Sequence, residues 1–378
     1  MWKQLSQTVS EALSGRITAR VLLLAGAILA GFMLISLLFF RSVTAPEEGM
    51  DSVVFFQIGT GSVGEDYFSV GERLAAIISR PPGTPRCEAG LPCGVAGLVA
   101  VSRSSSGPLA NLRAVSAGLF DSALVPAPIL YMATRGEGAF RGESPVRNVR
   151  AIASVYQEAL YIVTSRNADI ASLSAMKGMR VSIGEAGTGT GEAARAVLAA
   201  NRIDRRSAHL FEHDLTTSIE MMLRGQLDAF FMLDAMPSPT IASLAARGSI
   251  NLIPVSYEEA EDAALQQSGF AHTIIEADAY RFIPETRLLV VPTIWIVNEN
   301  EEGTLIHRIS DALFRRDNHA FLSGAGLPGL LPGSGTEQMK TAISTLPVPL
   351  HDGARRYFID QGVIVETVPR PVSRPGRG

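Results

Sequence analysis

The chain has 378 residues, of which 47% are hydrophobic and 19% charged, and its formal net charge is −4. This length allows two domains of ordinary size, and the composition is typical of a globular protein rather than a disordered one. The net charge is negative and no stretch interleaves aromatic with basic residues. The sequence therefore predicts no nucleic-acid partner.

The N-terminal part contains one long apolar segment. Residues 21–40 carry no charge, and a helix of that length spans a hydrocarbon core of about 30 Å. Lys3, Arg16 and Arg20 precede it, so the positive-inside tendency places residues 1–20 in the cytoplasm. The sequence thus predicts a single-pass anchor in the inner (cytoplasmic) membrane, a linker over 41–50 and a main domain in the periplasm or extracellular space.

A cleaved signal peptide is the alternative for this segment. The apolar run is longer than a usual signal-peptide core, and Pro46 directly follows the small residues 43–45. Both features favour the uncleaved anchor.

Two cysteines, Cys87 and Cys93, lie six positions apart in a Pro- and Gly-rich stretch. No histidine neighbours them, so a zinc site would lack its other ligands. In an oxidising compartment a local disulfide is expected, and two free thiols are the alternative.

Two stretches share one pattern, a buried strand followed by a Gly-rich loop and a helix. In the first, residues 53–58 lead into 59–64; in the second, residues 179–183 lead into 184–191. Glycines allow backbone N–H groups to approach a ligand at the start of a helix. The pattern predicts two lobes, each presenting a polar Gly-rich turn.

Strands and helices alternate along the chain, which predicts an α/β fold with a parallel sheet flanked by helices. The apolar run over 288–297 is expected to be a strand that crosses between the lobes, and residues 305–314 a helix back in the first lobe. The Pro- and Arg-rich end, residues 361–378, is expected to be disordered.

Three motifs suggest other chemistry, and each lacks a required part. Gly59-x-Gly61-x-x-Gly64 matches a dinucleotide fingerprint, but no acidic residue ends a second strand about 20 residues on. The loop 184–190 resembles a phosphate-binding loop without its Lys.

The third motif is the string His209-Leu-Phe-Glu-His213, which matches a metalloprotease pattern that requires a helix. The residues around it instead predict a strand with His209, Phe211 and His213 on one side. The sequence therefore predicts no metal site, no cofactor and no catalytic group, and we expect the protein not to be an enzyme.

Several motifs in order resemble the TAXI family, the solute-binding subunits of TRAP transporters. The resemblance covers about residues 53–360 and is carried by the segments 58–62, 111–118, 121–125, 151–158, 187–190, 228–231 and 348–357. It implies a two-lobe type II periplasmic-binding-protein fold, with lobe 1 formed by 51–157 plus 296–360 and lobe 2 by 158–295. It also implies two membrane subunits as partners and a small-molecule ligand, expected to be a carboxylate.

The resemblance also implies the binding residues. From lobe 1 these are Ser62 and Tyr67, with Asn111 left open between a ligand contact and a helix-start residue. From the segment between the lobes they are Tyr156 and Glu158, and from lobe 2 they are Thr188, Gly189 and Thr190.

Prolines mark where the chain departs from the family pattern. Pro108 removes an amide donor, and residues 126–128 read Pro-Ala-Pro where the family has Gln-Ser-Asp. These departures predict a more apolar cleft rim on lobe 1. An anchored receptor that signals to a membrane partner without transport is the alternative function.

Overall fold

In the computed structural model of the chain, the structure describes residues 53–63, 66–85, 87–88, 93–168, 170–322 and 335–364. The expected anchor at 21–40, the linker and most of the C-terminal tail lie outside the described residues. Within the described ranges, no helix combines the length and the apolar character needed to cross a membrane.

The described strands form one sheet of ten strands together with a separate two-stranded ribbon. The main path runs β4-β1-β5-β12-β6-β9-β7-β8, while β10 pairs with β6 and β11 with β12. The strands of the sheet are β1 (Val54–Gly59), β4 (Leu98–Arg103), β5 (Ser122–Pro126), β6 (Val149–Ser165), β7 (Arg180–Ser182), β8 (His209–Phe211), β9 (Ala229–Ala235), β10 (Ile250–Leu252), β11 (Ala271–Ile275) and β12 (Thr286–Asn298); the ribbon is β2 (Ser79–Arg80) and β3 (Val95–Ala96).

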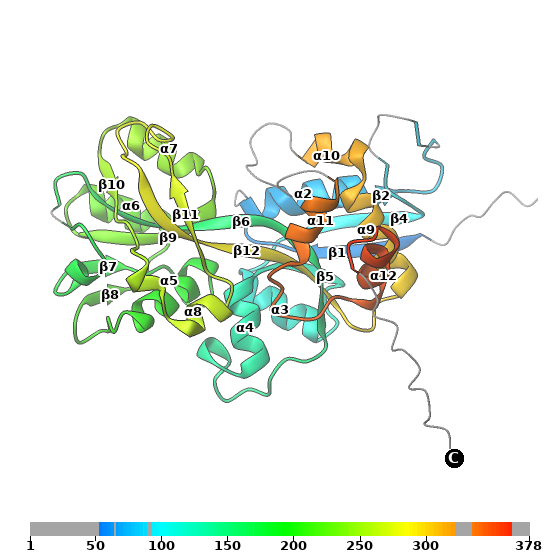
Figure 1. Cartoon of the computed structure of the whole chain (residues 1–378), viewed down its shortest axis with the longest axis horizontal. Coiled ribbons are helices and arrows are strands. Elements are labelled where there is room, and N and C mark those ends of the chain that lie inside the picture. The colour runs from blue at the N-terminus through cyan, green and yellow to red at the C-terminus, as the bar shows by residue number, and fades with distance from the viewer. Residues whose placement is uncertain are drawn as a thin grey trace, which may run out of the picture. The chain divides into compact units, whose positions relative to one another are not determined.

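Two long antiparallel strands, β6 and β12, run through both lobes and join them (Figure 1). On either side, short strands pair in parallel, β1 with β4 and β5 in lobe 1, and β7 with β8 and β9 in lobe 2. This confirms the predicted α/β organisation with a crossing strand over 288–297. The predicted boundaries between the lobes, at 157/158 and 295/296, fall inside β6 and β12.

Helices cover both faces of the sheet in each lobe. Those of lobe 1 are α2 (Asp66–Ile78), α3 (Pro108–Ser116), α4 (Ala127–Arg135), α9 (Gly303–Phe314), α10 (Arg316–Leu322), α11 (Gly335–Ile343) and α12 (Asp352–Asp360). Those of lobe 2 are α5 (Gly189–Ala200), α6 (Leu215–Leu223), α7 (Pro239–Ala246) and α8 (Ala263–Gln267), and the 3₁₀ turns are η1 (Gly138–Phe140), η2 (Ser174–Met176) and η3 (Glu258–Ala260).

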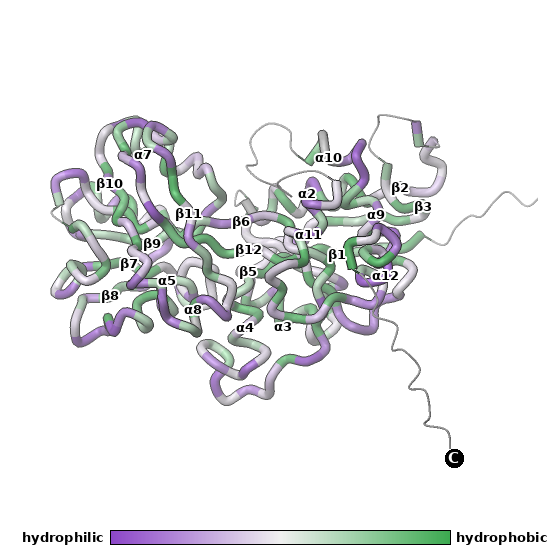
Figure 2. The backbone as a smooth tube through the Cα atoms, in the orientation of Figure 1, coloured by the Kyte–Doolittle hydropathy of each residue, from purple (hydrophilic) through white to green (hydrophobic). Residues whose placement is uncertain are grey.

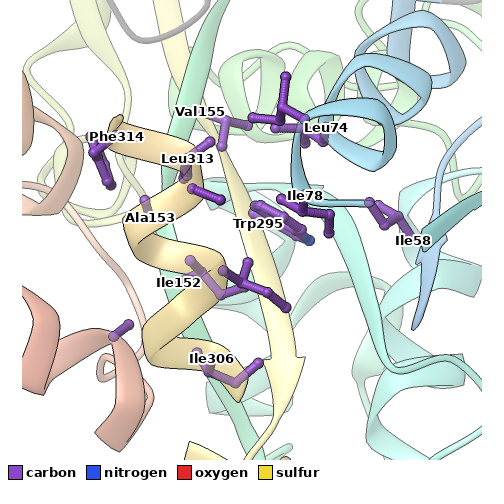
Figure 3. Packing of buried hydrophobic residues seen from close by; sticks show 14 of the residues in the cluster. Ile58, Leu74, Ile78, Ile152, Ala153, Val155, Trp295, Ile306, Leu313 and Phe314 are labelled. Carbon is purple, nitrogen blue, oxygen red and sulfur yellow. The ribbon is translucent and has the colours of Figure 1, made fainter. Parts of the chain in front are cut away.

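Each lobe has its own core, as the two-residue period of the crossing strands dictates. In lobe 2, Ala159 and Tyr161 of β6 face one apolar cluster, and Leu160 and Ile162 face another. In lobe 1, Leu74 and Ile78 of α2 and the side chains of α9 pack around the fully buried Trp295 of β12 (Figure 3). The interior strands are largely hydrophobic and the outer loops hydrophilic (Figure 2).

The predicted disulfide is present. Cys87 and Cys93 are bonded, with Cα atoms 5.6 Å apart. The buried Asn318 of α10 accepts a hydrogen bond from the Cys93 N–H at 2.7 Å, and its amide donates to the Cys93 carbonyl at 3.1 Å. Cys93 is therefore fastened to α10 of lobe 1.

Candidate functional site

A cavity of about 500 Å³ lies between the lobes. Lobe 1 contributes Ser62, Tyr67 of α2 and residues 106–108 at the start of α3, and the crossing strand β6 contributes Glu158. Lobe 2 contributes residues 231–234 of β9 and the starts of three helices. The lining residues are Ser62, Tyr67, Ser106, Gly107, Pro108, Glu158, Gly184, Glu185, Thr188, Gly189, Thr190, His213, Asp214, Leu215, Ser218, Phe231, Met232, Leu233, Asp234, Pro239 and Thr240.

Six of the eight residues implied by the family resemblance line this cavity, and whether they bind a ligand stays a prediction. They are Ser62, Tyr67, Glu158, Thr188, Gly189 and Thr190. The other two, Asn111 and Tyr156, are not among its lining residues.

Glu158 lies where the lobes join. Its side chain is 2% exposed. Its Oε2 accepts a hydrogen bond from the Tyr67 hydroxyl at 2.6 Å and a short one from the Thr293 hydroxyl. Burial, and then the neighbouring Glu158 carboxylate, raise the pKa of Tyr67 well above its ordinary value, so Tyr67 acts as a hydrogen-bond donor.

Register shifts in the β6–β12 pairing occur beside this point. They fall between Thr293 and Ile294 and between Trp295 and Ile296. Such irregularities locally redirect side chains, and here they lie next to the residue whose hydroxyl meets Glu158.

The Gly-rich loop of lobe 2 uses its threonine hydroxyls internally. Thr188 caps α5: its Oγ1 accepts from the Gly191 N–H at 3.0 Å and donates to the Glu185 carbonyl at 2.8 Å. The Thr190 Oγ1 accepts from the Leu233 N–H at 3.0 Å. Both hydroxyls therefore shape the cavity wall and are already engaged in the fold.

Asn111 is a structural residue of lobe 1. It is fully buried in α3, and its amide donates to the Thr60 carbonyl at 2.9 Å and to the Leu124 carbonyl at 3.2 Å. These bonds fix the loop after β1, which carries Ser62. Tyr156 is likewise 2% exposed, and its ring contacts that of Tyr67, with centroids 6.1 Å apart.

The lobes contact each other at glycines beside the cavity. A methyl group on Gly107 would lie 3.7 Å from the Gly187 carbonyl oxygen. One on Gly189 would lie 3.6 Å from Pro126 Cγ and 3.7 Å from the Tyr67 hydroxyl. Pro126, expected at an apolar rim, is instead buried against lobe 2 and does not line the cavity, because it ends β5 deep in the sheet.

Sequence reasoning missed His213, Asp214 and Asp234. His213 follows β8, stacks on Phe211 with ring centroids 5.5 Å apart, and has a buried Nε2 with no hydrogen-bond partner among the described residues. Ligands of open α/β sheets bind at the carboxyl ends of parallel strands. The position of His213 just after a strand, and of Asp234 near the end of β9, was a signal that could have identified them.

Asp214 begins α6 as its N-cap. It accepts hydrogen bonds from the Thr217 hydroxyl at 2.6 Å and the Thr217 N–H at 2.9 Å. These bonds lower the pKa of Asp214, so its carboxylate is ionised at neutral pH.

The lining is rich in carboxylates. Glu158, Glu185, Asp214 and Asp234 line the cavity, and among the described lining residues there is no Lys or Arg. This charge does not support the carboxylate ligand implied by the family resemblance. In the described part of the chain no group of three or more His, Cys, Asp or Glu side chains is placed to hold a metal ion.

Two lobes that share long crossing strands and enclose a cavity define a mixed α/β, periplasmic-binding-protein-like fold. The sequence profile of the NMT1-like family matches residues 58–362, and the chain belongs to that family.

Two binding proteins are among the solved structures to which the chain is similar. The alkanesulfonate-binding protein SsuA from Xanthomonas axonopodis pv. citri, bound to MOPS, is 12% identical, with a TM-score of 0.40, over 82% of this chain and 84% of that one. A TctC solute-binding protein from Polaromonas is 12% identical, with a TM-score of 0.43, over 82% of this chain and 97% of that one.

Proposed function

We propose that this chain is an extracytoplasmic solute-binding protein whose two lobes close on one small polar solute. The observation that carries the proposal is the cavity of about 500 Å³ walled by both lobes and by Glu158 between them. Pockets of roughly 300–1,000 Å³ suit small-molecule ligands. Membership of the NMT1-like family supports this reading.

Closure of the two lobes about β6 and β12 provides the mechanism of solute capture. Opening the lobes would separate Tyr67 of lobe 1 from the loop at Gly189, and closing them brings both against the solute. The solute is then removed from water, and only the closed form presents both lobe surfaces together to a membrane partner.

The proposed type of transporter rests on the motifs that resemble the TAXI family. We propose that the closed protein delivers its solute to the membrane subunits of a TRAP-type secondary transporter. The apolar segment 21–40 anchors the chain in the cytoplasmic membrane, with the binding domain on the far side.

A ligand screen tests the binding function. The full-length chain, purified in a mild detergent, is screened by thermal shift against amino acids, amines, organic acids, sulfonates and sugars. A ligand at a hundred times its Kd adds about 2.7 kcal/mol, enough to shift Tm by several degrees. Titration calorimetry of a hit should give one site per chain.

Two variants make the screen specific to the cavity. Thr240→Trp fills the cavity from the start of α7 and should abolish the shift, whereas Thr216→Trp, on an exposed position of α6, should preserve it. Binding that survives Thr240→Trp would place the solute elsewhere, and conversion of the bound compound would contradict a pure binding role.

A membrane test addresses the anchor and the partner. The chain should resist carbonate extraction at its full mass; release at a lower mass would show that residues 21–40 are a cleaved signal. Affinity capture of the closed protein should return transporter subunits, and capture of a sensor protein instead would favour the receptor function.

A further inference from the structure

The charged side chains around the cavity are of one sign. Glu158 lies on β6, Glu185 in the Gly-rich loop, Asp214 at the start of α6 and Asp234 near the end of β9. Among the described lining residues, His213 is the one His, and there is no Lys or Arg.

We propose that the solute of this cavity carries a cationic nitrogen and has a net charge of zero or above, with Glu158 accepting that nitrogen. The inference rests on the proposed solute-binding function and names its ligand class.

Glu158 is the centre of the argument. The residue is 2% exposed, and its Oε2 is oriented by the hydroxyls of Tyr67 and Thr293. Both hydroxyls are neutral donors, so neither brings a positive charge to Glu158. An anionic solute closed against this carboxylate would be repelled in a site of low dielectric constant, whereas an ammonium group would be attracted.

Aromatic rings reinforce the same preference. Tyr67 and Phe231 line the cavity together with the carboxylates. The faces of aromatic rings attract ammonium groups, and rings combined with carboxylates are the chemistry that recognises amines and quaternary ammonium ions.

The positive ends of the lobe 2 helices are already occupied by the protein. Side chains of Thr188, Asp214 and Ser238 cap α5, α6 and α7. By contrast, α3 of lobe 1 begins after Gly107 without a side-chain cap. The carboxylates of the cavity and the capped helix ends of lobe 2 together disfavour a dianionic solute.

Matched pairs of compounds test the inference on the full-length chain in detergent. Leucine is compared with 4-methyl-2-oxopentanoate, γ-aminobutyrate with butyrate, and putrescine and glycine betaine with succinate, by thermal shift and then titration calorimetry at pH 7.5. In each pair we expect the compound with a cationic nitrogen to bind. The matched compound that lacks this nitrogen should bind at least tenfold more weakly.

Single substitutions test which carboxylates attract the cationic nitrogen of the solute. Glu158→Gln keeps the shape of the side chain and removes its charge, and it should weaken amine binding at least tenfold, about 1.4 kcal/mol. Asp214→Asn should weaken it in the same direction while folding normally, because Asn also caps helices. Glu72→Gln, exposed on α2 outside the cavity, makes the same charge change and should leave affinity unaltered.

The outcomes separate the two proposals. Tight binding of succinate or an oxo acid, retained or strengthened in Glu158→Gln, overturns the ligand class and leaves solute binding intact. Binding by none of these compounds, nor by any compound of the wider screen, overturns the solute-binding function and this inference with it.

Discussion

Thr188 illustrates how one side chain can be interpreted in two ways. The family resemblance implies a ligand contact, and in the structure its hydroxyl caps α5 and donates to the Glu185 carbonyl. Its hydroxyl therefore holds the Gly-rich loop in shape.

Replacing Thr188 by Val should lower the free energy of unfolding by about 1 kcal/mol, because the Gly191 N–H loses its acceptor. Thr188→Ser keeps the hydroxyl and serves as the matched control. Urea unfolding of both variants checks this; equal stability of Thr188→Val and the parent chain would mean that the cap contributes nothing.

Glu301 makes stability depend on pH. Burial, and then the nearby negative charge of Asp121, raise its pKa to about 7. An ordinary Glu titrates near 4.5 in the unfolded chain. Between these values the folded chain keeps a proton that the unfolded chain releases, so the unfolding free energy falls as pH rises through this window.

The variant Glu301→Gln removes this loss of unfolding free energy at high pH. Its Tm should exceed that of the parent at pH 8 by about 2 °C, since roughly 1 kcal/mol remains after solvent screening, and should match the parent at pH 4.5. Thermal melts across pH measure the difference, with the exposed Glu72→Gln as control. A constant offset at all pH values would show that Glu301 does not titrate in this range.

Among the elements, the loop closed by Cys87 and Cys93 shows how local covalent chemistry and distant packing combine. The bridge closes a short loop, and Asn318 of α10 holds the Cys93 backbone from 225 positions away. Spacing predicts the bridge, while its attachment to α10 depends on the folded chain.

Changing both cysteines to Ser should lower the unfolding free energy by about 2 kcal/mol, the loop-closure value for so short a loop. Reducing agent should lower the Tm of the parent to that of the variant and leave the Tm of the variant unchanged. A reductant effect that persists in the variant would assign it to something other than this disulfide.

For the whole molecule, the two lobes share a sheet but have separate cores, and they meet at Gly107, Gly187 and Gly189. Such an arrangement permits hinge bending about β6 and β12, because each lobe keeps its own core when the lobes move apart.

Small-angle scattering of the full-length chain in detergent should therefore show a smaller radius of gyration after addition of a bound amine. Thr240→Trp, which fills the cavity, should show no change on the same addition. An identical radius with and without a bound solute in the parent chain would exclude closure as the response to binding.

The amino-acid sequence by itself determined the α/β class, the crossing strand over 288–297, the Gly-rich turns and the disulfide. Each depends on local patterns, such as the alternation of apolar residues, the freedom of glycine and the short spacing of the cysteines. Only the tertiary structure decided the site. Tyr67 and Thr293 reach Glu158 from 91 and 135 positions away, and His213 enters the cavity because β8 ends at its edge. Those encounters depend on strand order and on two strands shared between lobes, which no local pattern encodes.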